Sequence, residues 1–308
     1  MRAFTALINP IAGGGRATRH WAPVAARLAT AGADVRVELT RSGEHARQEA
    51  QAAAGAGRVV IAVGGDGLVR DVAGGVVPGG GLMGIVPAGR GNDLALALRL
   101  PADPDSLAEL LLGAEPRTID AIEADRGTPG SQGTAAGGVI VPGNVYAGID
   151  SVASEIINAS RWLPALVAYR LAPVRAIAGW HPPVFTLTLD GVTSTLRAHT
   201  VVVANSGRYG HGLHIVPPAL VDDGLLHVMT VGAGPRRAVI SFLRQAGHGG
   251  HVHRPEVEIR TGREVTIAAD RPLPVGADGD GLGRLPITVR IRPGALRLIA
   301  PPPEAHAT

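Results

Sequence analysis

The chain of 308 residues contains no cysteine, and all 29 of its basic residues are arginine, so it contains no lysine either. Without cysteine, the chain has no disulfides, no thiolate metal sites and no cysteine nucleophile. A Walker-type phosphate loop, a protein-kinase active site and a Schiff-base enzyme each require a lysine, so these three classes are also excluded.

Aromatic residues are scarce at 3 %, whereas hydrophobic residues make up 45 % of the chain. We therefore expect a core of valine, leucine, isoleucine and alanine in a globular protein. There is no run of about 18 uncharged apolar residues that could span a bilayer. The N-terminus leads straight into a strand pattern without a secretory signal, so a cytoplasmic location is expected. The formal net charge of +3 fits a transient contact with anionic membranes. It is too weak and dispersed to indicate nucleic-acid binding.

A glycine-rich turn at residues 64–67 is the most informative local feature. The apolar, β-branched run 58–63 predicts a buried parallel strand, and residues 68–75 have a helical pattern. Between them, Gly64, Gly65 and Gly67 surround Asp66. Such glycines let the backbone turn sharply and direct several N–H groups at one point, where the helix dipole adds positive potential. The turn is therefore predicted to hold a phosphate group.

A second turn of the same kind follows the next predicted strand, 82–86. It comprises residues 87–91 and is followed by Asn92 and Asp93 at the expected start of a helix. Because the carboxyl ends of parallel strands meet at one edge of a sheet, we expect both turns to face one crevice.

The first part of the chain alternates between strand and helix patterns. The expected strands are 4–8, 35–39, 58–63 and 82–86, and the expected helices are 18–31, 43–54, 68–75 and 105–112. This alternation predicts an N-terminal doubly wound, Rossmann-like nucleotide domain over residues 1–124. Right-handed crossovers would place the loops 9–16, 40–43, 64–67 and 87–93 at one edge of the sheet.

After a strand at 119–124 and a loop at 127–138, short strand patterns dominate. They lie at 139–148, 184–190, 195–204, 224–231, 256–260, 264–269 and 286–292, with helical inserts at 151–178 and 235–246. This pattern predicts a mainly antiparallel β-sandwich domain over residues 125–300, which would bind the substrate. The active site would lie in the cleft between the two domains. Residues 301–308 are expected to be a disordered tail.

Several motifs together resemble one known family. In the first half they are Asn9-Pro10 with Gly13-Gly14-Gly15, Thr40 with His45-Ala46, the turn 64–67, and Gly89-x-Gly91-Asn92-Asp93; in the second half they are Asn205, Pro218-Ala219, residues 222–225 and Asp278-Gly279. In this order they resemble the diacylglycerol kinase catalytic family, and more narrowly the soluble bacterial lipid kinases of the NAD kinase and diacylglycerol kinase superfamily.

The resemblance implies an ATP- and Mg²⁺-dependent lipid kinase that transfers the γ-phosphoryl group to a lipid hydroxyl. It implies ATP contacts from Asn9, Thr40, Gly64, Gly65, Asp66, Gly67, Leu68, Gly89, Arg90, Gly91, Asn92 and Asp93. Asp93 and Asp120 would belong to the acidic network around the nucleotide and its Mg²⁺. A structural Mg²⁺ would bind Asp223 and the carbonyls of Leu220 and Leu225. Asp66, Asp278 and Asp280 are the implied catalytic residues, with Asp280 as the base.

Three positions depart from the family pattern. Leu68 and Arg90 each replace a threonine, and Asp280 replaces a glutamate that is one methylene longer. Arg90 offers a bidentate guanidinium that suits a phosphate. The chemistry needs clamped phosphates, a metal and a carboxylate base, all of which the chain provides without lysine, so we expect an active enzyme.

Two alternatives remain open at this point. The first is phosphorylation of a soluble alcohol, as in NAD kinase, which would need a polar second domain where a lipid kinase needs an apolar groove. The second is a degenerate nucleotide-binding regulator without turnover. The acceptor lipid, whether diacylglycerol, a sphingoid base, phosphatidylglycerol or an isoprenoid alcohol, is not defined by the sequence, and neither is a possible homodimer.

Two further segments have ambiguous patterns. His248, His251 and His253 lie among glycines, and we expect a solvated loop rather than a metal site. The stretch 161–180 mixes tryptophan and leucine with arginine, so it fits either an amphipathic helix on the membrane or a helix packed on the second domain.

Overall fold

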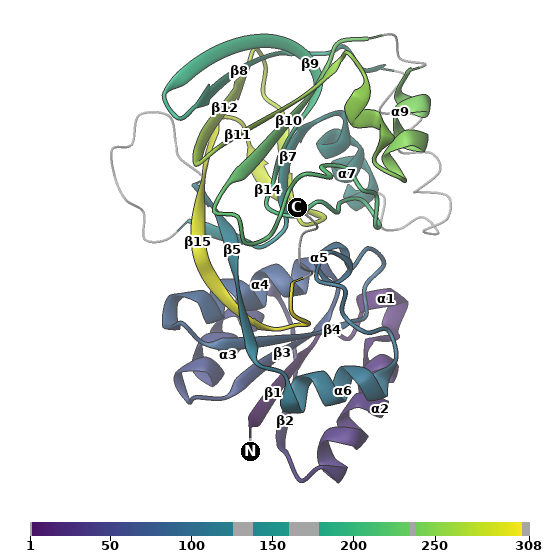
Figure 1. Cartoon of the computed structure of the whole chain (residues 1–308), viewed down its shortest axis with the longest axis vertical. Helices are drawn as coiled ribbons and strands as arrows, with labels where there is room; N and C mark the ends of the chain where they lie inside the picture. Colours follow the sequence, from purple (N-terminus) through teal and green to yellow (C-terminus); the bar gives the residue numbers. More distant parts are fainter. Residues whose placement is uncertain (1, 126–137, 160–178, 235–237, 304–308) are drawn as a thin grey trace.

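The computed structural model describes residues 2–125, 138–159, 179–234 and 238–303. It consists of two halves stacked along the long axis, with the N-terminal half at the bottom of Figure 1 and the later strands above it. Most of the predicted loop at 127–138, most of the stretch at 161–180 and the last five residues of the predicted tail lie outside the described residues.

The N-terminal half is a parallel sheet covered by helices on both faces. Its strands are β1 (Ala3–Ile8), β2 (Asp34–Leu39), β3 (Val59–Gly64) and β4 (Leu82–Pro87), in the order β2-β1-β3-β4. Its helices are α1 (Ala12–Gly15), α2 (Ala17–Thr30), α3 (Gly43–Gly55), α4 (Asp66–Val76), α5 (Asp93–Ala97) and α6 (Pro104–Gly113), with the short 3₁₀ helix η1 (Val77–Gly79). This arrangement confirms the predicted doubly wound sheet.

Strand alternation assigns the side chains of this sheet to two cores. Phe4 and Ile61 point to the face covered by α2 and α6, whereas Leu7 and Val60 point to the face covered by α3 and α4. Each large apolar side chain that is fully buried in this way stabilises the fold by about 1.5–3 kcal/mol. The sheet is therefore a rigid support for the loops at its carboxyl edge.

The second half consists mainly of antiparallel strands. The strands are β5 (Pro116–Asp125), β6 (Val139–Val141), β7 (Asn144–Gly148), β8 (Val184–Leu189), β9 (Val192–Ala204), β10 (Leu226–Gly232), β11 (Val257–Gly262), β12 (Glu264–Ala269), β13 (Pro274–Ala277), β14 (Asp280–Arg284) and β15 (Ile287–Ile299). The helical segments are α7 (Ile149–Ala159), α9 (Ala238–Ala246) and the 3₁₀ helix η2 (Gly250–His253).

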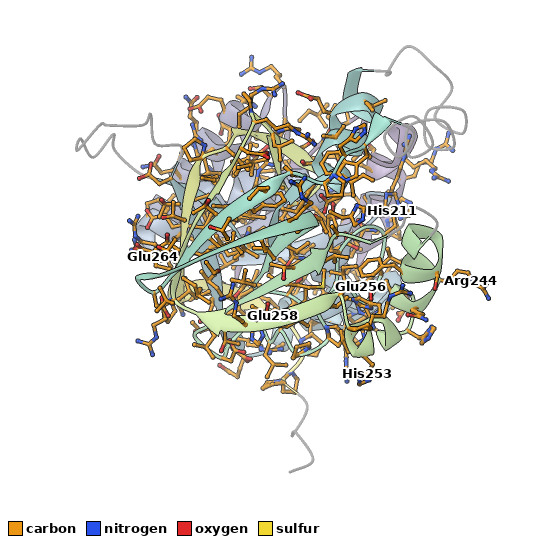
Figure 2. All side chains as sticks on the ribbon, turned by 90° about the horizontal axis from the view of Figure 1, so that it is seen from above. His211, Arg244, His253, Glu256, Glu258 and Glu264 are labelled. Carbon is orange, nitrogen blue, oxygen red and sulfur yellow. The ribbon has the colours of Figure 1, made fainter. Side chains whose placement is uncertain are left out.

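Strand β9 joins the two layers of the sandwich. Its first part pairs with β8, and its second part, from Ala198 onward, pairs with β7 and β10. Apolar side chains from both layers, such as Phe185, Val203 and Val275, fill the space between them. The predicted β-sandwich is therefore confirmed. In the view from above the sandwich, Glu264 lies at its periphery (Figure 2).

Two long strands, β5 and β15, run through both halves (Figure 1). They pair with each other, and β15 also pairs with β12 in the sandwich and, in parallel, with β4 in the N-terminal half. The sequence predicted a strand only as far as residue 292, because proline and glycine follow. A register shift between Arg292 and Leu296 lets β15 continue past them. The proposed domain boundary near residue 124 stays a prediction.

Two other details of the second half differ from expectation. The predicted strand 139–148 is two strands, because Pro142 and Gly143 interrupt it between β6 and β7. The hairpin of β13 and β14 was not predicted, since its residues look like a glycine-rich turn. Among the described residues, no helix has the length and apolar character needed to cross a membrane.

Candidate active site

The two glycine-rich turns lie against each other, backbone to backbone. A Cβ atom added to Gly89 would be only 2.3 Å from the Cα of Gly65, and one added to Gly65 would be 3.1 Å from the Cα of Gly89, so a side chain at Gly89 would collide with the first turn. The Ala88 amide donates to the carbonyl of Gly64 at 2.8 Å, which ties the ends of β3 and β4 together. The prediction that both turns face one crevice is therefore correct, and glycine is required by this close approach.

Asn92 holds the second turn in shape. It precedes α5 with φ of 54°, and its side-chain oxygen accepts from the Gly89 amide at 2.8 Å. On the neighbouring turn, the Asp66 carboxylate accepts from the Leu94 amide at 3.4 Å. Asp66 therefore connects the start of α4 with the start of α5 instead of projecting freely into solvent.

The opposite wall of the crevice comes from the β13–β14 hairpin. Asp278 has φ of 46°, and its carboxylate accepts from the amides of Asn144 at 2.7 Å and Gly143 at 3.2 Å. Two residues later, Asp280 lies directly beside the start of α4, because a Cβ atom on Gly67 would be 2.3 Å from its Oδ2. Residues about 210 positions apart in the sequence thus form one site.

The resulting cleft has a volume of about 380 Å³ between the two halves. Its lining comprises Gly65, Asp66, Gly67, Arg90, Gly91, Asp93, Tyr146, Ser154, Tyr209, Gly210, His211, Asp278, Gly279 and Asp280. Four carboxylates therefore surround this space: Asp66 and Asp93 from the two turns, and Asp278 and Asp280 from the hairpin. Arg90 lines the same space.

Burial and charge repulsion raise the pKa of two carboxyl groups of this cleft, Asp66 and Asp278. Burial, together with the charge of Asp93, raises the pKa of Asp66 to about 6. Burial and the charge of Asp66 raise the pKa of Asp278 to about 7, although two amides donate to it. A site with this much concentrated negative charge is suited to bind a cation.

Asp93 fastens a loop of the second half over the first. Its Oδ1 accepts from the Gly212 amide at 2.6 Å and its Oδ2 from the His211 amide at 3.4 Å. The same loop carries Tyr209, whose ring lies 4.6 Å from that of Tyr146, centroid to centroid. These two aromatic rings form the inner wall of the cleft.

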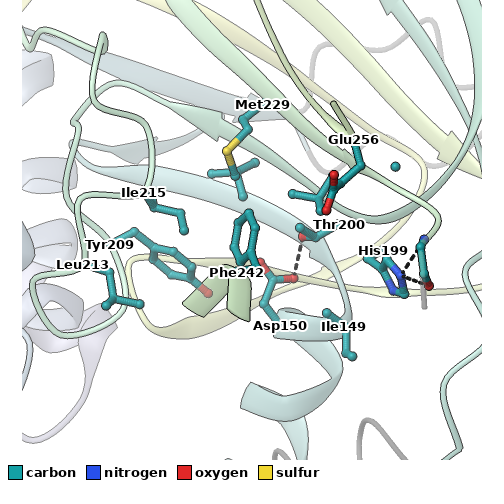
Figure 3. A pocket seen from close by; sticks show the side chains of 14 residues that line it. Ile149, Asp150, His199, Thr200, Tyr209, Leu213, Ile215, Met229, Phe242 and Glu256 are labelled. Atoms are coloured by element: carbon teal, nitrogen blue, oxygen red, sulfur yellow. Dashed lines mark hydrogen bonds between the residues drawn. The ribbon is translucent and has the colours of Figure 1, made fainter. Parts of the chain in front are cut away.

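Behind Tyr209 lies a second, apolar cavity of about 110 Å³ (Figure 3). Most of its lining is apolar and comes from α7, β9, the loop after β9, β10 and α9; it includes Ile149, Val202, Leu213, Ile215, Met229, Val231 and Phe242. Its two carboxylates already have partners: Asp150 accepts from Thr200 at 2.9 Å, and Glu256 pairs with Arg254 at 2.6 Å. Tyr209 belongs to the lining of both the polar cleft and the apolar cavity.

Some of the predicted nucleotide contacts are not in the lining of the cleft. Asn9 accepts from the Ile11 amide at 3.1 Å within its own loop, and the Thr40 hydroxyl donates to the Ile8 carbonyl at 3.2 Å. The Leu68 side chain packs in the core beneath Gly64, so any contact it makes with a nucleotide would come from its backbone. The ATP contacts of these residues stay predictions.

Asp120 and Asp223 lie together at a different place. The Asp120 carboxylate accepts from the Gly224 and Gly294 amides, each at 2.7 Å. The Asp223 carboxylate accepts from the Leu225 amide at 2.9 Å and contacts His227 Nε2 at 2.8 Å.

The structure thus separates Asp120 from the residues that line the cleft. Neither Asp120 nor Asp223 is in that lining. The metal-binding roles of both residues, and those of the Leu220 and Leu225 carbonyls, stay predictions. In the described part of the chain, no three His, Asp or Glu side chains converge closely enough to hold a metal ion by themselves.

The sequence did not identify three of the residues that shape the site. Tyr146 and Tyr209 are brought together by strand pairing and a loop, which leave no local signal. Arg70 could have been found, because it lies one helical turn after Asp66 and therefore on the same side of α4.

The histidine segment is only partly solvated. His248 and His253 are exposed, and His253 lies at the edge of the molecule in Figure 2. His251 is fully buried, and its Nε2 lies 2.7 Å from the Ile215 carbonyl. The expectation of a solvated loop is therefore wrong for His251, which packs edge to face against Phe242.

Comparison with known proteins agrees with this geometry. Residues 3–124 match the diacylglycerol kinase catalytic domain, and residues 143–300 match the YegS C-terminal NAD kinase beta sandwich-like domain. The chain therefore belongs to the diacylglycerol kinase family and is a kinase of the lipid-kinase class.

Individual relatives cover nearly the whole chain. A diacylglycerol kinase of Mycobacterium tuberculosis is 33 % identical, with 96 % of this chain and 94 % of the relative covered. A protein of Pseudomonas fluorescens named "Probable lipid kinase YegS-like" is 29 % identical over 91 % of this chain and 90 % of its own. The crystal structure of a diacylglycerol kinase from Bacillus anthracis has the same fold, with a TM-score of 0.72, 19 % identity and coverage of 98 % and 97 %.

Proposed function

We propose that the protein transfers the γ-phosphoryl group of ATP to the hydroxyl group of a membrane lipid, with diacylglycerol as the first acceptor to test. The observation that carries this proposal is the contact between a carboxylate-lined cleft and an apolar cavity, which share Tyr209. A lipid acceptor has a matching pair of parts: its polar hydroxyl end would suit the carboxylate-lined cleft, and its apolar chain would suit the cavity.

The apolar cavity supports a lipid rather than a dinucleotide acceptor. A second nucleotide would need polar partners where Val202, Met229 and Val231 lie. A volume of about 110 Å³ admits only the first part of an acyl chain; an engineered apolar cavity of ~150 Å³ takes one benzene. We therefore propose that the first part of the acyl chain enters this cavity while the rest of the lipid stays in the bilayer. The protein would contact that bilayer from its cytoplasmic side.

The residues of the two turns fit a triphosphate. Gly65, Gly67 and Gly91 line the cleft without a side chain that would cover their backbone, and the start of α4 adds the positive end of its dipole. Arg90 lines the same cleft and offers a guanidinium for a phosphate oxygen. Backbone donors and arginine would thus do the work that lysine does in other kinases.

The donor set of the cleft fits Mg²⁺ only together with phosphates. Mg²⁺ at a nucleotide is typically bound by one or two carboxylates plus phosphate oxygens, and Asp66 and Asp93 lie close enough to interact electrostatically. Their oxygen atoms would hold the ion. When bound, Mg²⁺ neutralises charge on the phosphates.

Asp280 is the best candidate for the base among the carboxylates of the cleft. It is 43 % exposed, whereas Asp278 uses its oxygens to accept two amides. Asp280 would accept the proton of the lipid hydroxyl while that oxygen bonds to the γ-phosphorus and ADP leaves. Substitution by asparagine would remove the basic carboxylate but keep the size and shape of the side chain.

The test is incubation of the purified protein with labelled ATP, Mg²⁺ and a panel of lipids in mixed micelles. We expect phosphorylation of diacylglycerol, or of another long-chain alcohol in the panel. For the cavity, Val231→Phe should lower kcat/KM for a dioleoyl acceptor about tenfold, which corresponds to about 1.4 kcal/mol. For a short-chain acceptor with the same headgroup, kcat/KM of the variant should fall less than about twofold, since this acceptor occupies less of the cavity.

The matched control is Val192→Phe, the same change at an exposed position of the β8–β9 hairpin. This variant should leave kcat/KM unchanged for both the long-chain and the short-chain acceptor. Equal losses for long and short acceptors in the Val231 variant would show that the cavity does not hold the chain. ATP binding without turnover on any lipid would favour the regulator alternative. A transient membrane contact and a homodimer remain predictions that vesicle co-sedimentation and sedimentation velocity would check.

A further inference from the structure

The side chain of Arg70 connects the two halves at the cleft. It lies on α4, and its side chain is only 12 % exposed. On one side its guanidinium donates to the Asp71 carboxylate, from Nη2 at 3.0 Å and from Nε at 3.3 Å. On the other side it donates to the Ala277 carbonyl at 3.0 Å and to Asp280 Oδ2 at 3.4 Å.

A guanidinium in this position is not explained by stability alone. Burial would lower the pKa of Arg70, but the charges of Asp71 and Asp280 raise it above its usual value. Buried ion pairs are often no more stabilising than apolar side chains of the same volume, because both charges must lose their water. What arginine adds is geometry: a planar group whose N–H bonds point in two directions at once.

The group that this geometry constrains is Asp280. Asp280 begins β14 directly after a turn in which Asp278 and Gly279 both have positive φ. The shape of this turn sets where the Cα atom of Asp280 lies, but not where its carboxylate points. Its carboxylate is partly exposed and would otherwise rotate. Gly67 on one side and Arg70 on the other leave it one position beside the start of α4.

We propose that Arg70 is a positioning residue for Asp280, and that Asp71 orients Arg70 in turn. The inference rests on the proposed function, because it takes Asp280 as the base. Arg70 bonds the backbone of the hairpin at Ala277 and the side chain of Asp280. It therefore constrains both the position of the hairpin relative to α4 and the orientation of the Asp280 carboxylate. Asp71 is itself packed against Gly43 at the start of α3, where an added Cβ atom would collide with it.

The expected effect follows from the cost of misplacement. A shift of about 1 Å in a catalytic group costs on the order of 100-fold in rate. Arg70→Gln should therefore lower kcat about 30-fold and change KM for ATP less than about threefold, since Arg70 does not line the cleft. Arg70→Lys should recover only part of the loss, because an ammonium cannot bond Asp71 and Asp280 in the same fork. Asp71→Asn should lower kcat less, by about threefold, since it keeps one acceptor for Arg70.

The decisive experiment is a double-mutant cycle between Arg70→Gln and Asp280→Asn, measured as kcat with the lipid that the panel identifies. If Arg70 acts through Asp280, the double variant should be no slower than Asp280→Asn alone. Losses that multiply would overturn the proposal and assign Arg70 a separate structural role. Arg47→Gln, at an exposed arginine of α3 that pairs with Glu44, is the control and should keep full activity.

A second readout separates this proposal from the proposed function. In a crystal structure of the Arg70→Gln variant, the Asp280 carboxylate should have left its place beside Gly67 by about 1 Å or more. An unmoved Asp280 would overturn the positioning role even if lipid turnover is found. A wild-type protein that phosphorylates no lipid would refute the proposed function, and the crystal structure would still decide whether Arg70 positions Asp280.

Discussion

Asp150 in the apolar cavity should make the protein less stable as the pH rises. Burial raises the pKa of this carboxyl group to about 6 from 3.8, although Thr200 and the Ser151 amide donate to it. Because the folded-state pKa is raised, the folded protein favours the neutral form. The stabilising contribution is complete below pH 3.8 and is lost as the pH rises through 6.

The size of the effect follows from the shift. About two pKa units correspond to about 3 kcal/mol in total, of which about 1.5 kcal/mol is lost between pH 5 and pH 8. Asp150→Asn keeps an oxygen that can accept from Thr200 and Ser151 but has no proton to lose. The variant should therefore gain about 1.5 kcal/mol relative to wild type between pH 5 and pH 8. For a chain of this size that is about 3 °C in Tm.

Urea unfolding of both proteins at pH 5, 6, 7 and 8 would measure this difference. The comparison must be made between variant and wild type, because the raised pKa values of Asp66 and Asp278 affect the wild-type profile in the same direction. Asp270→Asn, at an exposed carboxylate, is the matched control. A stability difference between the Asp150 variant and wild type that stays constant or shrinks with rising pH would refute the reasoning.

Two further predictions concern backbone space and a buried cation. Gly67→Ala should lower kcat at least about tenfold with little change in Tm, because the new Cβ would displace the Asp280 carboxylate; Gly55→Ala, whose Cβ meets open space, should be neutral. Arg58→Ala should destabilise the protein by about 3 kcal/mol in urea unfolding, since it strips the hydrogen-bond donors from Thr5 Oγ1 and the Phe4 carbonyl in the interior and leaves a void. A loss below about 1 kcal/mol would contradict that estimate of the buried hydrogen bonds.

The parts of the fold that local patterns encode were predictable. The strands 58–63 and 82–86 and the two turns after them follow from β-branched runs that end at glycines. Their meeting at one crevice follows from the parallel sheet. Asn92 and Asp93 were correctly expected at the start of a helix.

The parts that depend on distant partners were not predictable in the same way. The segment of β13 and β14 is rich in glycine and aspartate, which have low strand propensity, and β13 adds to the sheet by pairing with β7, which is more than 120 residues earlier. The apolar cavity is formed by residues of α7, β9, the loop after β9, β10, α9 and the turn before β11, and no periodicity in any one of them indicates it. The contact of Arg70 with Asp280 joins residues 210 positions apart, so it depends on the packing of the hairpin beside α4.

The course of β15 has a consequence for how the protein is made. On a ribosome, β4 emerges early with only β3 beside it, and its other edge waits for residues near 297 and 298 to be synthesised. An unpaired strand edge can pair with other chains, so the nascent N-terminal half would need protection until these residues of β15 have been synthesised. Strand β4 therefore acquires its second neighbour at Leu82 and Met83, the end away from the cleft, from residues more than 200 positions later, and removing that part of β15 should weaken the sheet that carries both turns.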